Sequence, residues 1–272
     1  MHKRLSGLIE LLKTIGLVLA FALIPRAVLC QPFTIPSGSM MPTLLVGDYL
    51  VVSKFAYGWS RHSLPLSPPL AHGRIAGQTP APGDIVVFKE PSDARTDIIK
   101  RVIGLPGDRI QMSRGRLQIN GRPVGREVLP PQLSEGPFGQ PVSIEHHRET
   151  LPNGRRFETA SFGPDTVAAN TGVYLVPQGC YFVMGDNRDN SADSRFDPGA
   201  APAGQSSCPW DTALDAYFPP QHGMGFVPAD NLVGRAEVVL FSIEQGTSLL
   251  KPWTWAGGVR WGRSFHSLRA AG

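Results

Sequence analysis

Two serines flank a single glycine near the start of the chain, at Ser37-Gly38-Ser39, and the residues Met-Met-Pro follow directly. A serine hydroxyl becomes an effective nucleophile when a base within hydrogen-bond reach takes its proton. An apolar N-terminal segment ends shortly before these serines. Any chemistry of the two hydroxyls is therefore expected at a membrane surface, on substrates that are themselves held in the bilayer.

Lys100 is the candidate base, because none of the histidines lies in a motif-like setting. It belongs to the run 97–103, whose alternation places it on one strand face with Ile98 and Val102. Burial against apolar neighbours disfavours the ammonium form and lowers the pKa of a lysine. A neutral amine can accept the proton of a serine. The alternative is an edge-strand lysine with its amine in solvent or paired with a carboxylate.

A polar loop follows a later apolar run: residues 185–195 read Gly-Asp-Asn-Arg-Asp-Asn-Ser-Ala-Asp-Ser-Arg. Such short polar side chains favour a loop held by its own hydrogen bonds. A calcium loop is one alternative, but its sixth position is Ser194 instead of glycine and its twelfth is Ala200 instead of glutamate. A purely structural turn is the other alternative for this loop.

Metal chemistry is not expected elsewhere in the chain. With no Cys-x-x-Cys and no histidine cluster at ligand spacing, we expect neither a metal nor a cofactor.

The elements that position these residues are predicted to be strands. Short apolar runs bounded by Gly, Pro or Asp are typical of strands, and Asn120-Gly121 predicts a hairpin turn. The runs are 49–52, 84–88, 98–103, 109–112, 117–119, 174–176, 180–184 and 236–243. The fold class is therefore mainly β, with closed or partly closed sheets.

Four regions are expected along the chain. Residues 1–30 form a cytoplasmic tail and a transmembrane anchor, and residues 31–122 and 172–245 form the catalytic β domain. Residues 123–171, poor in apolar runs, form an inserted subdomain, and residues 246–272 form an aromatic and basic tail. A second insertion at 197–224, rich in Pro, Gly and Ala, is expected to be a surface loop.

The anchor prediction depends on the charge pattern of the first thirty residues. Residues 14–25 carry no charge, and an extension to 8–30 reaches spanning length with Lys13 and Arg26 near its ends. A cleaved secretory signal is the alternative, but no small-x-small site follows the apolar run. The basic residues at the N-terminus place that end in the cytoplasm and the rest of the chain outside.

Composition narrows the remaining choices. The formal net charge is +4, and the 26 basic residues form no run, so nucleic-acid binding is not expected. Three cysteines are too few for a disulfide scaffold. Cys180 and Cys208 could pair if the body lies outside the cytoplasm, or they could remain as two buried thiols, with Cys30 in the anchor.

The motifs become specific when they are taken together. Ser-Gly-Ser-Met-Met-Pro-Thr-Leu at 37–44, Lys-Arg-Val-Ile-Gly-Leu-Pro-Gly-Asp at 100–108 and the polar loop occur in one order. In this order they resemble bacterial type I signal peptidases. Supporting matches lie at 47–48, 54–58, 82–88 and 232–236. The resemblance covers residues from about 31 to 241, apart from the two insertions.

The resemblance implies a role for each matching residue. Ser39 corresponds to the nucleophile and Lys100 to the general base of a Ser-Lys dyad. Ser191 corresponds to the hydroxyl that helps to orient the lysine amine, and the Ser37 hydroxyl with the Ser39 amide to the oxyanion hole. Asp193 and Arg195 correspond to a supporting ion pair. Asp186 is a further candidate for support.

The resemblance also implies a substrate and a location. Secretory preproteins would bind as an added strand and be cut after small-x-small (Ala-x-Ala) sites, so their signal peptides are removed. The other expected partners are membrane lipid and, by proximity, the secretion machinery. The expected location is the bacterial inner membrane, with one pass and the catalytic domain on the outer side. The alternatives are a Ser-Lys peptidase dedicated to a narrow substrate, such as one of pilus assembly or conjugation, and an inactive binding module.

Overall fold

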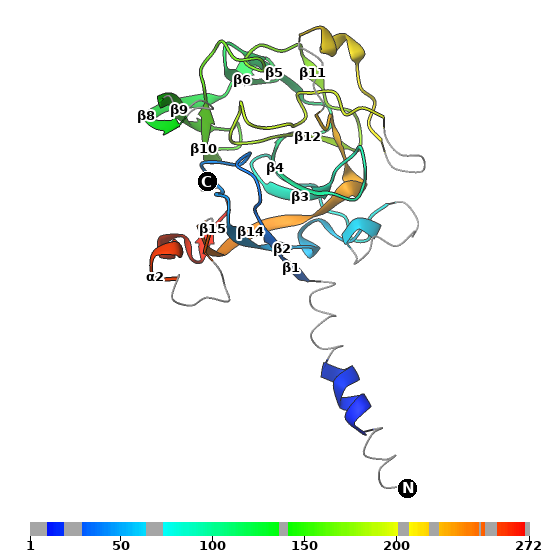
Figure 1. Ribbon diagram of the computed structural model, residues 1–272. Helices are drawn as coiled ribbons and strands as arrows, with labels where there is room; N and C mark the ends of the chain where they lie inside the picture. The colour runs from blue at the N-terminus through cyan, green and yellow to red at the C-terminus, as the bar shows by residue number, and fades with distance from the viewer. Residues whose placement is uncertain are drawn as a thin grey trace.

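The structure is a computed structural model, and it describes residues 10–18, 29–63, 73–135, 141–200, 207–217, 223–244, 246–247 and 255–269. The prediction of a mainly β protein is confirmed, and each predicted apolar run overlaps a strand, with Asp84, Val176 and Ile243 just outside the strand ends. Residues 10–18 are helical and lie apart from the β-sheet body in Figure 1. No helix among the described residues combines the length and hydropathy needed to cross a bilayer. Most of the predicted anchor, at 1–9 and 19–28, lies outside the described residues.

The largest sheet runs in the order β1-β2-β14-β3-β4-β12-β13, with β15 paired to β14, and its ladders are antiparallel. Figure 1 shows the long strand β14, in orange, passing beside β2 and β3. The bounds are β1 (Cys30–Thr34), β2 (Asp48–Ser53), β3 (Ile85–Lys89), β4 (Asp97–Gly104), β12 (Cys180–Met184), β13 (Val227–Pro228), β14 (Leu232–Ser242) and β15 (His266–Ser267). Cys30, expected as the last residue of the anchor, is therefore the first residue of β1.

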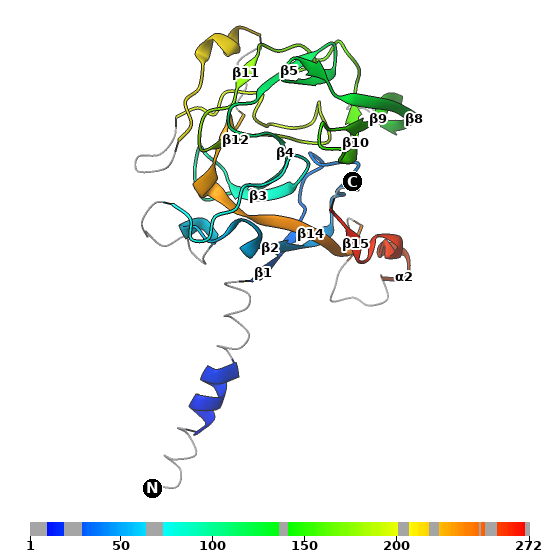
Figure 2. The same ribbon diagram turned by 180° about the vertical axis from the view of Figure 1, so that it is seen from behind.

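Two smaller antiparallel sheets complete the fold, and Figure 2 shows them on the side of the molecule away from β1. One has the order β11-β5-β6-β7, and its last hairpin turns at Asn120 and Gly121, both with positive φ, as predicted. Its bounds are β5 (Arg109–Ser113), β6 (Arg116–Ile119), β7 (Arg122–Pro123) and β11 (Tyr174–Leu175). The other, called the three-stranded sheet below, contains β8 (Gly125–Glu135), β9 (Pro141–Thr150) and β10 (Arg156–Ser161) in the order β10-β9-β8.

Short helices lie in the connections. They are η1 (Phe55–Tyr57), η2 (Arg61–Ser63), η3 (Thr212–Tyr217), η4 (Ala229–Asn231), α2 (Trp255–Gly258) and η6 (Trp261–Arg263).

Strands β3 and β4 are buried on both faces, which explains why their sequences read as almost continuous apolar runs. On β3, Ile85 and Val87 pack into one core cluster with Leu50 of β2, whereas Val86 and Phe88 pack into a second. A third cluster joins β5, β6 and β12 to Phe157 of the three-stranded sheet. The region expected as an inserted subdomain thus shares its core with the main body.

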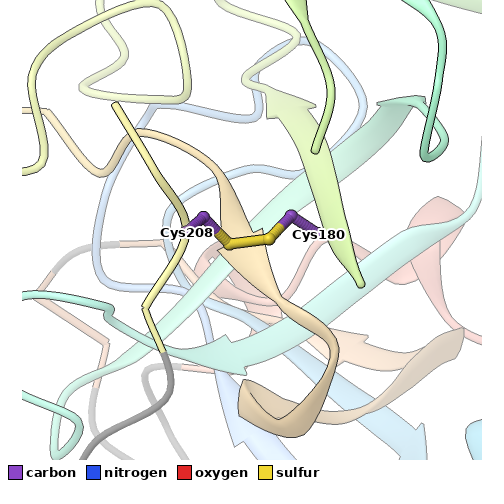
Figure 3. The surroundings of a disulfide bond; sticks show 2 residues. All are labelled: Cys180 and Cys208. Atoms are coloured by element: carbon purple, nitrogen blue, oxygen red, sulfur yellow. A yellow bond between two sulfur atoms is a disulfide. The ribbon is translucent and has the colours of Figure 1, made fainter. Parts of the chain in front are cut away.

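The described part of the second insertion lies largely at the surface, as expected, but it also contributes a disulfide and a few packed side chains to the body. Cys208 forms a disulfide with Cys180 at the start of β12, as Figure 3 shows. Trp210 packs near Phe226 with ring centroids 5.8 Å apart, and Leu214 is buried in the same cluster. The apolar residues of this segment cover the end of a core that would otherwise face water.

The C-terminal tail directs its arginines to protein groups. Arg263 pairs with the buried Asp48 at 2.5 Å and donates to the carbonyl of Thr43 at 2.9 Å. Arg260 donates to the hydroxyl of Ser242 at 2.8 Å. These guanidinium groups therefore tie the tail to β2, β14 and the segment after Ser39.

Candidate active site

The segment after β1 presents Ser39 by burying its neighbours. Met40 and Leu44 are completely buried in the core cluster of β2 and β3. The amide of Met41 donates to the carbonyl of Gly38 at 3.1 Å, and the amide of Leu44 to that of Met40 at 2.9 Å. Two apolar side chains thus hold a tight turn in place, with the Ser39 side chain at its start.

Lys100 meets Ser39 from β4. Its Nζ donates a hydrogen bond of 2.8 Å to Ser39 Oγ, and the residue is only 5% exposed. The register places it opposite Val86, and its neighbours Ile98 and Val102 pack in the same cluster as Val86, in agreement with the predicted alternation. Burial lowers the pKa of Lys100 to about 8, although Asp193 and Asp186 act in the opposite direction.

Ser37 lies beside this pair. Its Oγ is 3.4 Å from Ser39 Oγ, and either hydroxyl could be the donor. Ser37 itself is exposed, so its hydroxyl can turn toward a ligand that approaches Ser39 from solvent. The structure thus brings together the two hydroxyls and the amine that the sequence singled out.

The polar loop begins with Gly185, which is packed beneath the site. A Cβ at Gly185 would collide with both Ser191 Oγ and the carbonyl oxygen of Ser39. Ser191 is buried next to this glycine, and its hydroxyl has no hydrogen-bond partner among the described residues. The contact expected between Ser191 and the Lys100 amine is therefore not formed as a hydrogen bond.

The ion pair expected between Asp193 and Arg195 is present and fully buried. Arg195 Nε donates to Asp193 Oδ1 at 2.8 Å and Nη2 donates to Oδ2 at 2.9 Å. The amide of Gly185 donates to the same carboxylate at 3.0 Å. Burial alone would raise the pKa of Asp193, but Arg195 and the Gly185 amide lower it, so the carboxylate stays ionised. Because the Gly185 amide binds Asp193, this carboxylate joins the two ends of the polar loop.

Asp186 has a buried partner that sequence reasoning missed. Arg101, the residue after Lys100, binds Asp186 with two hydrogen bonds of 2.7 and 2.6 Å. Its guanidinium lies 4.1 Å from the ring centroid of Phe157 and donates to Thr43 Oγ1 at 3.3 Å. Strand alternation was the signal available for Arg101: on a strand buried on both faces, a residue next to a buried lysine is buried too.

Asn187 is the second residue that sequence reasoning missed. Its amide donates to the carbonyl of Ser39, and its side-chain Nδ2 donates to the carbonyl of Gly38, both at 3.1 Å. The polar loop therefore holds the turn that carries Ser39 by donating hydrogen bonds to two main-chain carbonyls of that turn. No spacing rule in the sequence points to this contact, because it joins segments about 150 residues apart.

The calcium-loop alternative does not fit the observed contacts. Asp193 is engaged by Arg195, and Asp189 accepts the amide of Phe162 at 2.7 Å. Within the described ranges, no group of three or more His, Cys, Asp or Glu side chains could hold a metal ion.

A hydroxyl beside a buried amine of lowered pKa can carry out acyl transfer. Comparisons with known proteins agree with this chemistry. The chain matches the family model described as "Signal peptidase, peptidase S26" over residues 8–241, a range that includes all the site residues. Signal peptidase I of Rickettsia canadensis (strain McKiel) is 35% identical over 273 aligned positions, 94% of this chain and 92% of that protein.

Further matches point to the same family. Signal peptidase I of Rickettsia typhi (strain ATCC VR-144 / Wilmington) is 34% identical over 268 positions, 92% of this chain and 90% of that protein. A crystal structure of a signal peptidase I from Enterococcus faecalis V583 is 24% identical and covers 58% of this chain and 97% of that chain, but its TM-score of 0.27 is too low to support an argument about the fold. The chain therefore belongs to the signal peptidase family, peptidase S26, whose members are serine endopeptidases that remove signal peptides from preproteins.

Proposed function

We propose that Ser39 is the nucleophile and Lys100 the general base of this peptidase. The observation that carries the proposal is the hydrogen bond of 2.8 Å between Lys100 Nζ and Ser39 Oγ. It lies in a buried site where the lysine pKa falls to about 8. A sizeable fraction of the amine is then neutral near pH 7 to 8 and can act as a base.

The reaction follows from these two groups. Neutral Lys100 takes the proton of Ser39 as Oγ attacks the scissile carbonyl, and the resulting ammonium returns that proton to the leaving amine nitrogen. An ester between Ser39 and the signal peptide remains. Lys100 then takes a proton from water, whose oxygen attacks the ester, and the proton passes to Ser39 Oγ as the acid product leaves.

The neighbouring groups take supporting roles in this proposal. The Ser37 hydroxyl and the Ser39 amide stabilise the oxyanion that forms on the scissile carbonyl. Ser191, which is buried and whose hydroxyl has no hydrogen-bond partner among the described residues, positions the Lys100 amine. Asp186, Asp193 and Arg195 hold the polar loop, which is supported by the paired contacts described above.

The substrate and location extend the family assignment. Secretory preproteins with small-x-small sites, Ala-x-Ala above all, are cut while residues 1–30 anchor the chain in the bacterial inner membrane by one pass. The exposed Leu11, Leu12 and Leu17 in the helical residues 10–18 support contact with membrane lipid. Residues 31–122 and 172–245 form the catalytic domain on the outer side, close to the secretion machinery. Residues 123–171 form an inserted subdomain and residues 246–272 a tail.

The test is cleavage of a detergent-solubilised preprotein that carries an Ala-x-Ala site. The wild-type protein should cut after the second alanine, and Ser39→Ala and Lys100→Met should each lower kcat by roughly 1,000-fold or more. Lys89→Met is the matched control, because Lys89 lies on the neighbouring strand and pairs with Asp97 at 2.9 Å, away from the dyad.

Each result has a clear meaning. Activity that survives in a folded Ser39→Ala or Lys100→Met protein would refute the dyad. No cleavage by the wild-type protein would favour a peptidase of narrow substrate range or an inactive module. Loss of activity after treatment with EDTA would contradict a mechanism that uses only side chains.

A further inference from the structure

The three-stranded sheet reaches the polar loop through main-chain hydrogen bonds. The amide of Ala160 on β10 donates to the carbonyl of Asp186 at 2.9 Å, and the amide of Arg188 donates to the carbonyl of Ala160 at 2.8 Å. Asn187 thereby forms a parallel β-bridge with Ala160. The start of the polar loop is thus added to the edge of this sheet.

The side chain of Arg188 continues this contact into the sheet. Its Nη2 lies 2.5 Å from Oε2 of Glu149 on β9, and the two side chains are only 5% and 4% exposed. Arg188 Nε and Nη1 have no hydrogen-bond partner among the described residues. The charge of this guanidinium is therefore balanced chiefly by one carboxylate, in a place where an unbalanced charge is costly.

The surroundings of Glu149 add positive charge. Arg126 of β8 lies against the ring of His147. Its Nη2 is also 3.7 Å from Oε2 of Glu145, a carboxylate that is half exposed. Burial, Arg126 and Arg188 together lower the pKa of His147 to about 4, so this imidazole is neutral at neutral pH. Loss of the charge of Glu149 would leave Arg188 without its carboxylate partner, and Arg126, on which Glu149 also acts electrostatically, would lose a balancing charge as well.

The main chain at residues 187 and 188 is hydrogen-bonded to groups of the candidate active site. Its carbonyl accepts a hydrogen bond from Nη2 of Arg195, the partner of Asp193. The preceding residue, Asn187, donates to the carbonyl of Ser39. A displacement of Arg188 would therefore disturb the turn that carries the nucleophile and also the ion pair that closes the polar loop.

We propose that Glu149 is a positioning residue of the peptidase: it holds Arg188 and thereby keeps the polar loop in register with Ser39 and Lys100. The inference rests on the proposed dyad, and Glu149 itself does not touch the reacting atoms. It assigns the three-stranded sheet a part in the rate of the reaction, beyond its part in the fold.

The first test is Glu149→Gln in the full-length protein, which keeps the shape of the side chain and removes its charge. Cleavage of a preprotein with an Ala-x-Ala site should show kcat about 10-fold lower and KM within about 2-fold of wild type, because misplaced catalytic groups slow the reaction more than they weaken binding. Glu158→Gln on β10 is the matched control, since Glu158 pairs with Arg148 at the surface. It should leave both constants unchanged.

The second test removes both charges. If Glu149 acts through Arg188, the double variant Glu149→Met with Arg188→Met should recover kcat to within about 3-fold of wild type, while Glu149→Met alone stays low. This rescue also decides the matter should a single variant fail to fold. Wild-type kcat in Glu149→Gln, or a double variant no more active than Glu149→Met, would overturn the inference.

Failure of the dyad would look different from failure of this inference. Activity retained in Ser39→Ala or Lys100→Met would refute the dyad. The ratio of kcat between Glu149→Gln and wild type would still report whether Glu149 affects the reaction.

Discussion

The proposed mechanism depends on Lys100, and the surroundings of this residue lower the pKa of its amine. Two carboxylates, Asp186 and Asp193, lie near enough to raise its pKa, but each is engaged by its own guanidinium, Arg101 or Arg195. Their field at the amine is therefore partly cancelled, and the effect of burial dominates. The two ion pairs thus hold the polar loop without forcing the base into its charged form.

The pH dependence of turnover follows from this lysine. Lys100 must be neutral to act as a base, and its pKa is lowered to about 8, so kcat should rise with pH and level off above that value. The measurement is kcat on a soluble peptide from about pH 6 to about pH 10, with Lys89→Met expected to give the same midpoint. A midpoint near that of an ordinary histidine, about 6.5, would indicate a different base.

The same burial should cost stability. The folded-state pKa of Lys100, about 8, lies below its unfolded value of 10.5, so the unfolded chain binds more protons between these values and the free energy of unfolding rises with pH across that window. At pH 7 the difference between the two values corresponds to a penalty of about 3 kcal/mol. Lys100→Met should therefore be inactive yet up to about 3 kcal/mol more stable at pH 7.

Urea unfolding at several pH values measures this effect. The advantage of Lys100→Met over wild type should shrink as the pH rises from about 8 toward 10.5. A variant less stable than wild type at pH 7 would mean that neighbouring groups stabilise the ammonium by more than burial destabilises it.

Gly185 lies where the polar loop packs against the turn that carries Ser39. An added methyl group would meet Ser191 Oγ and the Ser39 carbonyl at distances that real side chains do not adopt. Gly185→Ala should lower kcat by roughly 100-fold, because the polar loop and the Ser39 turn must move apart. Gly262→Ala is the control, since nothing lies within 4 Å of the position of its Cβ. Wild-type kcat in Gly185→Ala would show that the site tolerates this displacement.

At the scale of elements, β4 supplies side chains both to the turn that carries Ser39 and to the polar loop. Consecutive residues of a strand point to opposite faces, so Lys100 reaches Ser39 while Arg101 reaches Asp186 and Thr43. The polar loop after β12 closes around both. Strand β4 thus contacts both the turn that carries Ser39 and the polar loop.

The segment joined by the Cys180–Cys208 disulfide is a second element with a measurable contribution. The bridge closes a loop with a sequence separation of 28, which corresponds to about 3 to 4 kcal/mol of stability in the chain-entropy model. The pair of changes Cys180→Ala and Cys208→Ala should lower Tm by about 10 °C. Cys30→Ser should leave Tm unchanged, because Cys30 is exposed and unpaired. An unchanged Tm in the double variant would show that packing of Trp210 and Leu214 suffices.

At the scale of the whole molecule, distant parts of the chain converge on the turn that carries Ser39. The polar loop holds its carbonyl groups through Asn187, β4 supplies Lys100, and Arg263 of the tail donates to the carbonyl of Thr43. Figure 2 shows the tail elements β15 and α2 beside β14 and β2. The turn is therefore assembled only when the sheets have formed.

The proposed anchor should matter for where the enzyme works and less for its chemistry. Leu29 belongs to the β body, because its carbonyl accepts the amide of Lys54. Removal of residues 1–28 should leave kcat/KM on a soluble peptide within about 3-fold, but slow the cleavage of a preprotein held in lipid vesicles by about 10-fold or more. Equal rates on vesicles would argue against anchoring as the role of this segment.

Much of the architecture could be predicted from the sequence because it depends on local patterns. Apolar runs and turn residues located most strands of the main body, but not β1, β7, β13 and β15, and the Asn120-Gly121 turn has the expected backbone. The three-stranded sheet was not resolved into strands, because its polar residues obscure the alternation. The packing role of Trp210 and Leu214 was missed for a related reason: a segment rich in Pro, Gly and Ala shows no period.

The residue types and their order by themselves pointed to the family and to the proposed chemistry: a serine, a lysine and a polar loop in a sequence that resembles one peptidase family. Only the tertiary structure decided the burial, the charge pairing and the hydrogen bonds of these groups. Sequence patterns assigned no role to Arg101, Asn187 or Glu149, because their partners lie far away along the chain. Burial and charge pairing depend on what packs around a residue, and the contacts that set the amine of Lys100 and the turn of Ser39 exist only once the strands have come together.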